Sequence, residues 1–230
     1  MTAKKKSNNT QEKSRRSHWL KLFLELIAVF VGITAGFFVN NYGEKRADRE
    51  LEQKYLSSLH TNLVSDSLEI HSLMEEDQTN LDISERTVMA MYSDSLKLDS
   101  ALAVIQVMGT FNNLYLKDAT YKSIVSSGKL GQIMDFEIRE EIVNYYSFLD
   151  DIQLAEEVYN NYVSDYVLPF IFNNLDLISN KLIGEFDPGD IEFRNLTTGY
   201  YAIASQKMDL IMSMDSLNIS LKNAIYKSLN

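Results

Sequence analysis

The longest continuous apolar segment of the chain lies near its N-terminus. Residues 22–39 contain a single charged side chain, Glu25. As a helix rising about 1.5 Å per residue, this stretch spans about 27 Å, close to the hydrocarbon thickness of a bilayer. Trp19 and Tyr42 bracket it, and their amphipathic rings favour the membrane–water interface. The pattern predicts a transmembrane helix over residues 19–42.

After this segment the apolar positions recur at helical spacing instead of running continuously. One stripe, interrupted at Asp66, is followed by a longer one over residues 136–172, interrupted at Glu156, and Pro169 should kink or end that helix. A last helix is expected over residues 198–229. With only 2 prolines and 9 glycines, the chain is predicted to be all-α, with the transmembrane helix followed by an antiparallel helical bundle. The apolar positions that define the stripes are Leu56, Leu59, Leu63, Ile70 and Leu73, then Ile138, Ile142, Tyr145, Leu149, Ile152, Tyr159, Val163, Tyr166 and Phe170, then Tyr201, Ala204, Met208, Ile211, Leu221 and Ile225.

Shorter elements are expected between these helices. Residues 99–108 and 118–127 predict two short helices, each opening with an aspartate that can cap it. Gly128 follows the second as a left-handed C-terminal cap. Residues 109–117 predict a loop or extended chain, and residues 184–198 a turn-rich loop.

Charge is divided unevenly along the chain, whose net charge is −10. Residues 1–21 carry +6 and residues 44–230 carry −15. This excess of basic side chains before the apolar segment predicts a cytoplasmic tail over residues 1–18 and an extracytoplasmic acidic helical domain over residues 44–230. The expected location is a bacterial inner membrane, with the main domain periplasmic. The apolar segment makes the lipid bilayer the expected partner. The acidic domain repels phosphate backbones, so nucleic acid is not expected as a partner.

Two alternatives to an anchor are open. A signal peptide could be cleaved around Thr34-Ala35-Gly36, although the apolar run continues through Val39 and is longer than usual for such a peptide. A buried core helix fits poorly with the step in charge across the segment.

One face of the predicted anchor combines polar and small residues, which favours association with another helix. At 100° per residue, Glu25, Ala28, Gly32 and Gly36 fall on the same side, and glycines let a second backbone approach closely. The partner would be a second copy or another membrane protein. The alternative is that glycine is simply common in membrane helices.

Tests for chemistry give no catalytic or metal-binding residues and no cofactor. The chain has no cysteine. His60 and His71 lie three helical turns apart, about 16 Å, too far for one ion. Ser126 and Lys129 match a Ser-x-x-Lys serine-hydrolase motif, but its Lys-Thr-Gly companion is missing. Adjacent carboxylates such as Glu156-Glu157 are interpreted as solvated faces, and the tyrosines between 145 and 166 as core residues and its margin. A possible ligand groove would involve Tyr121, Ser127, Gly128 and Tyr145.

Several motifs together resemble a family of small single-pass bacterial membrane proteins, the domain of unknown function 6090. They are Glu25-Leu26-Ile27-Ala28-Val29-Phe30-Val31-Gly32-Ile33, Asn40-Asn41-Tyr42, Tyr55-Leu56 with Leu59 and Leu63, Thr120-Tyr121, Ser127-Gly128-x-Leu130 and Asn144-Tyr145-Tyr146. The family usually has tryptophan where this chain has Tyr42. The resemblance implies a bacterial inner-membrane protein and supplies no activity.

The expected function is therefore a membrane-anchored, non-catalytic helical binding or scaffold module of the bacterial envelope. Such a module could also self-associate through its transmembrane helix. One alternative is a small accessory subunit of a membrane complex, with Glu25 pairing to a partner helix. Another is an envelope hydrolase without a recognisable motif.

Overall fold

The computed structural model describes residues 4–183 and 186–230, and it is an all-α structure, as the periodicity predicts. The chain divides into two compact units, Met1–Glu52 and Gln53–Asn230. Helix α1 (Lys4–Tyr92) contributes to both. It continues without a break through Gly43, the residue between the two expected helices that least favours a continuous helix.

The first unit carries the apolar segment on α1, and its side chains are exposed. An 18-residue window of this helix is long and apolar enough to cross a membrane, and none of it is buried within the protein. Trp19 and Tyr42 are also exposed. A core helix of a soluble domain would bury such residues, so that alternative is wrong. The exposed helix is consistent with a membrane anchor or with a signal sequence.

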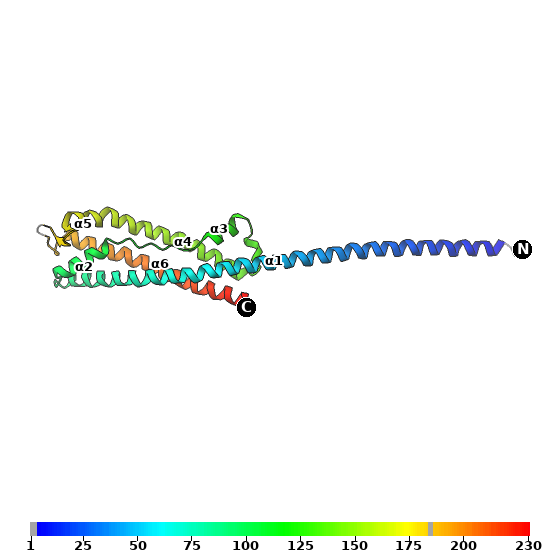
Figure 1. Ribbon diagram of the computed structural model, residues 1–230, viewed down its shortest axis with the longest axis horizontal. Helices are drawn as coiled ribbons and strands as arrows, with labels where there is room; N and C mark the ends of the chain where they lie inside the picture. The colour runs from blue at the N-terminus through cyan, green and yellow to red at the C-terminus, as the bar shows by residue number, and fades with distance from the viewer. Residues whose placement is uncertain (1–3, 184–185) are drawn as a thin grey trace. The chain divides into compact units, whose positions relative to one another are not determined.

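The second unit consists of helices packed around a shared core (Figure 1). The later part of α1 is joined by α2 (Leu98–Met108), α3 (Ala119–Ser126), the 3-10 turn η1 (Leu130–Gln132), α4 (Phe136–Tyr162), the π-helical turn η2 (Val163–Val167), α5 (Leu168–Asn174) and α6 (Ile191–Leu229), with a small hairpin of β1 (Leu175–Asp176) and β2 (Lys181–Leu182) before α6. The hairpin was not expected from the sequence.

Side-chain contacts give the directions of the long helices. His71 and Asp77 of α1 meet Asp215 and Lys207 of α6 in that order, so these helices run in opposite directions. Tyr145 and Tyr159 of α4 likewise meet Asn218 and Tyr200 of α6. The chain from α2 to α3 runs back along α1, and its central part is extended rather than helical (Figure 1).

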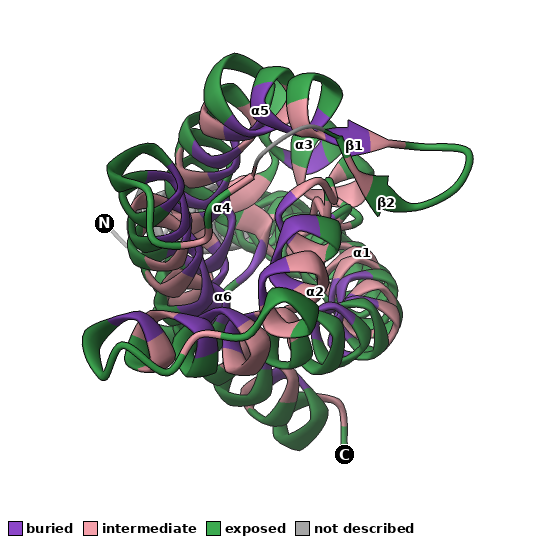
Figure 2. Ribbon diagram, turned by 90° about the vertical axis from the view of Figure 1, so that its left-hand side faces the viewer, coloured by how far each residue is buried: buried purple, intermediate pink, exposed green. Residues whose placement is uncertain are grey.

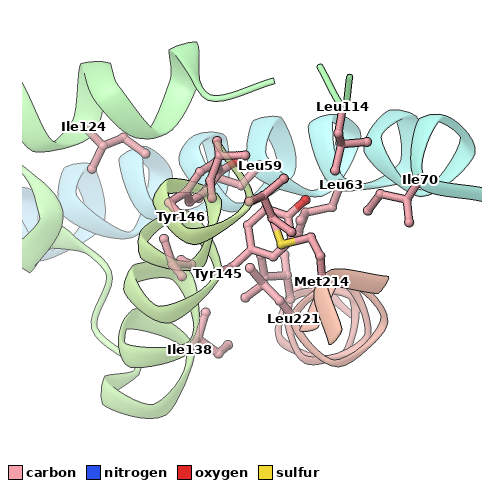
Figure 3. Close-up of a cluster of buried hydrophobic side chains, with 14 of the residues drawn as sticks. Leu59, Leu63, Ile70, Leu114, Ile124, Ile138, Tyr145, Tyr146, Met214 and Leu221 are labelled. Atoms are coloured by element: carbon pink, nitrogen blue, oxygen red, sulfur yellow. The ribbon is translucent and has the colours of Figure 1, made fainter. Parts of the chain in front are cut away.

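The buried faces of the helices in the second unit turn toward one another (Figure 2), and most of the buried residues are apolar. One cluster gathers around Leu59, Tyr145 and Leu221 (Figure 3), and the other around Met108, Phe193 and Tyr200. Every apolar residue expected on the first stripe is buried. The periodicity therefore identified this part of the core correctly.

The π-helical turn η2 corrects the expected core face beyond Val163. A π turn contains one residue more than an α turn, so it rotates the following side chains around the helix axis. Val167 is fully buried in place of Tyr166, which is 61% exposed. Pro169 directly follows η2, and the chain remains helical beyond it to Asn174, so the proline does not end the helix.

Two expected helix starts and two expected caps are also corrected. Helix α6 begins at Ile191 instead of residue 198, since its first turns bury Phe193 and Leu196 in the core. Helix α2 begins at Leu98, so Asp99 lies in its first turn and does not cap it. Asp118 occupies the N-cap position of α3, but its carboxylate pairs with Lys122 at 2.5 Å instead of capping.

Gly128 confirms the predicted end of α3. Its φ is +68°, in the left-handed region that favours glycine. The Gly128 N–H donates to Val125 O and the Lys129 N–H to Ile124 O, at 2.9 and 3.0 Å. This pair of bonds satisfies carbonyls that the ended helix leaves open.

Candidate functional site

The extended segment Gly109–Lys117 crosses the second unit between α1, α4 and α6, where its backbone has no helix or sheet partner. Buried backbone N–H and C=O groups must nevertheless be hydrogen-bonded. In this segment, as the sequence predicts, the chain is not helical. Its partners are side chains of the three long helices, several of them charged and buried. We take these side chains as the candidate site and call them the clamp: Asp66, Asp77, Tyr145, Tyr146, Glu156, Tyr159 and Lys207.

Asp66 of α1 forms the first part of the clamp. Its Oδ1 accepts the Lys117 N–H at 2.9 Å, and its Oδ2 accepts the Tyr145 hydroxyl at 3.3 Å. The Asn218 amide on α6 donates to the same hydroxyl at 3.2 Å and to Leu63 O at 3.1 Å. Asp66 is 1% exposed. This connected set ties α1, α4 and α6 to the end of the extended segment.

Burial favours the neutral forms of Asp66 and Tyr145. Loss of water raises the pKa of the Asp66 carboxyl, and the hydrogen bonds from Lys117 and Tyr145 offset only part of that effect. Burial also raises the pKa of the Tyr145 hydroxyl, so this residue stays a neutral phenol that can both donate and accept.

Glu156 of α4 forms the second part of the clamp. Its Oε1 accepts the Leu114 N–H at 2.5 Å in the middle of the extended segment. Burial raises the pKa of the Glu156 carboxyl, while the Leu114 N–H and the Lys207 ammonium group lower it. The earlier interpretation of the Glu156-Glu157 pair as a solvated face is therefore wrong for Glu156, which is buried while Glu157 is exposed.

Lys207 of α6 supplies the opposite charge. Its Nζ lies 3.0 Å from Asp77 Oδ2 and donates to Asn112 O. The Asn112 amide donates to Asp77 Oδ1 at 3.1 Å, and the Lys207 ammonium group lies 4.7 Å from the centre of the Tyr159 ring. Lys207 is 2% exposed. A buried ammonium group is tolerated only when it is paired and hydrogen-bonded in this way.

Two tyrosines form hydrogen bonds to the backbone at the two ends of the extended segment. The Tyr159 hydroxyl donates to Thr110 O at 3.0 Å, and the Tyr146 hydroxyl donates to Lys117 O at 3.4 Å. Tyr145, Tyr146 and Tyr159 are all buried, which confirms their interpretation as core residues. The clamp therefore contacts the segment at its start, centre and end.

Two residues of this clamp were visible in the pattern of apolar positions, and a third was overlooked. Asp66 and Glu156 stood out as the polar interruptions of otherwise apolar stripes, which is the pattern of buried polar residues. Lys207 stands three residues after Ala204 and four before Ile211, which places it on the apolar face of α6, but it was not identified. Asp77 had no comparable indication, since it is only partly buried.

The residues of the predicted groove lie in two settings. Tyr121 stacks on Tyr146 with ring centres 4.2 Å apart and planes 6° apart, and Tyr145 meets the same ring edge-on at 5.0 Å. Tyr145 is fully buried and is not accessible to a ligand in this structure. Ser127 and Gly128 are exposed at the end of α3, where the Ser127 hydroxyl donates to Ile124 O.

The candidate hydrolase and metal residues have other surroundings. Ser126 and Lys129 are exposed, and the Ser126 hydroxyl donates to Ser123 O of its own helix at 3.2 Å. The His60 ring lies against the Tyr226 ring, and His71 Nε2 lies 3.3 Å from Asp215 Oδ1. Over residues 4–183 and 186–230, no group of three or more histidines and carboxylates is placed to hold a metal ion.

The predicted association face lies on the exposed part of α1. Glu25, Ala28, Gly32 and Gly36 are all exposed. A Cβ atom added at Gly32 or Gly36 would meet nothing within 4 Å. No contact within the described part of the chain therefore requires glycine at either position.

No protein-family model, curated protein or solved structure matches the chain. The resemblance to the single-pass membrane protein family thus rests on the quoted motifs alone.

Proposed function

We propose that the protein is a membrane-anchored, non-catalytic helical module that binds or organises other components of the bacterial envelope. Its basic tail would lie in the cytoplasm and its acidic unit in the periplasm. The observation that carries the proposal is the exposed apolar segment of α1, which belongs to the same helix as the first element of the packed unit. Such a segment is stable only when lipid or another apolar surface covers it.

The buried charges support a structural and not a catalytic role for the core. Asp66 and Glu156 are used as acceptors for backbone N–H groups of the extended segment, and Lys207 is paired with Asp77. A general base or nucleophile must instead reach a substrate. These groups are enclosed by the three helices that they hold together.

Association through α1 would let the anchor organise a complex. The exposed glycines of the Glu25 face leave room for the backbone of a second helix. The homodimer and a partner membrane helix are both compatible with this face.

The absence of cysteine makes a clean topology experiment possible. We expect a Ser228→Cys variant to react with a membrane-impermeant maleimide once the outer membrane is permeabilised, and a Ser7→Cys variant to react only after lysis. Both should remain in carbonate-washed membranes. Recovery of soluble protein without its first forty or so residues would instead identify a cleaved signal peptide and refute the anchor.

A further inference from the structure

An aromatic cavity lies where α4 and α5 pass the first turns of α6. It has a volume of about 370 Å³ and is lined by Tyr162, Tyr166, Phe170, Glu192, Asn195 and Leu196. This volume is within the range of about 300–1,000 Å³ that is usual for small-ligand sites. None of these residues belongs to the clamp around the extended segment.

The π-helical turn η2 creates the aromatic wall of the cavity. Its additional residue gives the buried position to Val167 and leaves Tyr166 on the surface. Tyr166 there lies next to Tyr162, with ring centres 5.3 Å apart and planes inclined by 36°. Single π turns inside helices occur frequently at functional sites, and here the turn brings two tyrosines to one cavity.

The Tyr162 ring is fixed before any ligand arrives. Its hydroxyl donates to Leu196 O at 3.0 Å. It also packs against Gly199, where any Cβ atom would collide with the ring. Burial raises the pKa of the Tyr162 hydroxyl, which keeps it neutral. A ring held in place in this way loses little conformational entropy on binding.

The charge of the cavity selects the ligand class. Among the residues that the structure describes, Glu192 is the one charged side chain in the lining, and no lysine or arginine contributes. The faces of aromatic rings carry partial negative charge and attract cations. A quaternary ammonium group suits such a site because it donates no hydrogen bonds and is weakly hydrated.

We propose that this cavity binds a small organic cation with a quaternary ammonium group, held against Tyr162 and Tyr166 and neutralised by Glu192. This inference rests on the binding role proposed above and gives it a ligand class. The cation could be free in solution or be the headgroup of a choline lipid.

The test uses the full chain in nanodiscs of phosphatidylethanolamine and phosphatidylglycerol. Choline binding is measured by calorimetry and compared with 3,3-dimethyl-1-butanol, its uncharged carbon analogue. We expect choline to bind and the analogue to bind at least about tenfold more weakly. Equal binding of the two compounds would overturn the proposal, as would the absence of choline binding at millimolar concentration.

Variants locate the site. Tyr166→Ala and Glu192→Gln should each weaken choline binding by about three- to tenfold. Tyr115→Ala and Glu157→Gln are the matched controls, because both residues are exposed and lie outside the cavity. Circular dichroism melting curves verify that all four variants fold. Losses of the same size in the control variants would refute this location.

A second arm identifies the source of the cation. If a lipid headgroup occupies the cavity, nanodiscs that contain phosphatidylcholine should lower the apparent affinity for free choline, and Tyr166→Ala should remove that effect. An unchanged affinity identifies a free cation as the ligand. The topology is measured separately, on the Ser228→Cys and Ser7→Cys variants, so failed choline binding with the expected topology rejects the ligand without rejecting the anchor.

Discussion

The Glu156 carboxylate and the Leu114 backbone N–H meet at 2.5 Å, which joins α4 to the centre of an extended segment that has no strand partner. Together with Asp66 and Lys207, this contact replaces the hydrogen bonds that a helix would have made for itself. The second unit can therefore accommodate a non-helical segment among long helices. Its stability should depend on a few buried charged side chains.

Replacing Glu156 tests this dependence most directly. Glu156→Ala leaves the Leu114 N–H without its acceptor, and we expect a loss of about 3 kcal/mol in the free energy of unfolding. Glu156→Gln retains an acceptor and should lose about 1 kcal/mol. Chemical denaturation of the full chain measures both. The exposed neighbour provides the control, since Glu157→Ala should change stability by less than about 0.5 kcal/mol; equal effects at the two positions would contradict the clamp.

Lys207 and Asp77 should behave as a coupled pair. Lys207→Met leaves a carboxylate without its cation and should cost about 3–5 kcal/mol of unfolding free energy. In combination with Asp77→Asn the loss should be smaller than the sum of the single losses, by about 1–3 kcal/mol. A double-mutant cycle from denaturation curves gives this coupling. Lys227→Met, on the exposed end of α6, is the control, and strict additivity would show that the pair is not coupled.

Asp66 predicts a defined pH dependence. Burial raises its pKa in the folded protein above the ordinary value of 3.8, which the unfolded chain keeps. Between these two values the folded state binds more protons, so the free energy of unfolding falls as pH rises through this window. The ionised Asp66 thus opposes folding above the window, and protonation relieves that effect.

The comparison with Asp66→Asn isolates this contribution, because Glu156 and the other acidic groups titrate in both proteins. The wild type should gain stability relative to the variant when the pH is lowered from about 7.5 to about 4, close to the unfolded pKa. Denaturation curves at both pH values provide the measurement. A stability difference that does not change with pH would rule out the raised pKa.

The association face of α1 gives a prediction in the membrane. Gly32→Ile and Gly36→Ile should reduce self-association or partner association by at least about tenfold, because a larger side chain separates the two backbones. Neither change disturbs the chain itself, since a Cβ atom at these positions meets nothing within 4 Å. A two-hybrid reporter in bacterial membranes measures the effect.

Thr34→Ile serves as the matched control for this experiment. Thr34 is also small, and it stands two residues from each glycine, about 160° around the helix from both. It should leave association unchanged. Association that survives both glycine substitutions would exclude this face.

The sequence by itself determined the features that depend on local chemistry. The apolar segment before Val39 predicted an exposed helix long enough to cross a membrane. The spacing of leucines and isoleucines predicted the buried faces of the long helices, and Gly128 predicted the left-handed end of α3. Each of these follows from side chains close together in the sequence, through hydrophobicity, the 3.6-residue period or backbone sterics.

Only the tertiary structure decided how the interruptions in these patterns are used. Asp66 and Glu156 were visible as misplaced polar residues, but their partners lie on a segment far away along the chain. The pairing of Lys207 with Asp77 and the place of Tyr166 beside the aromatic cavity have the same origin. The free energy of a buried charge or of a displaced helix turn depends on which distant side chains enclose it, and local periodicity does not contain that information.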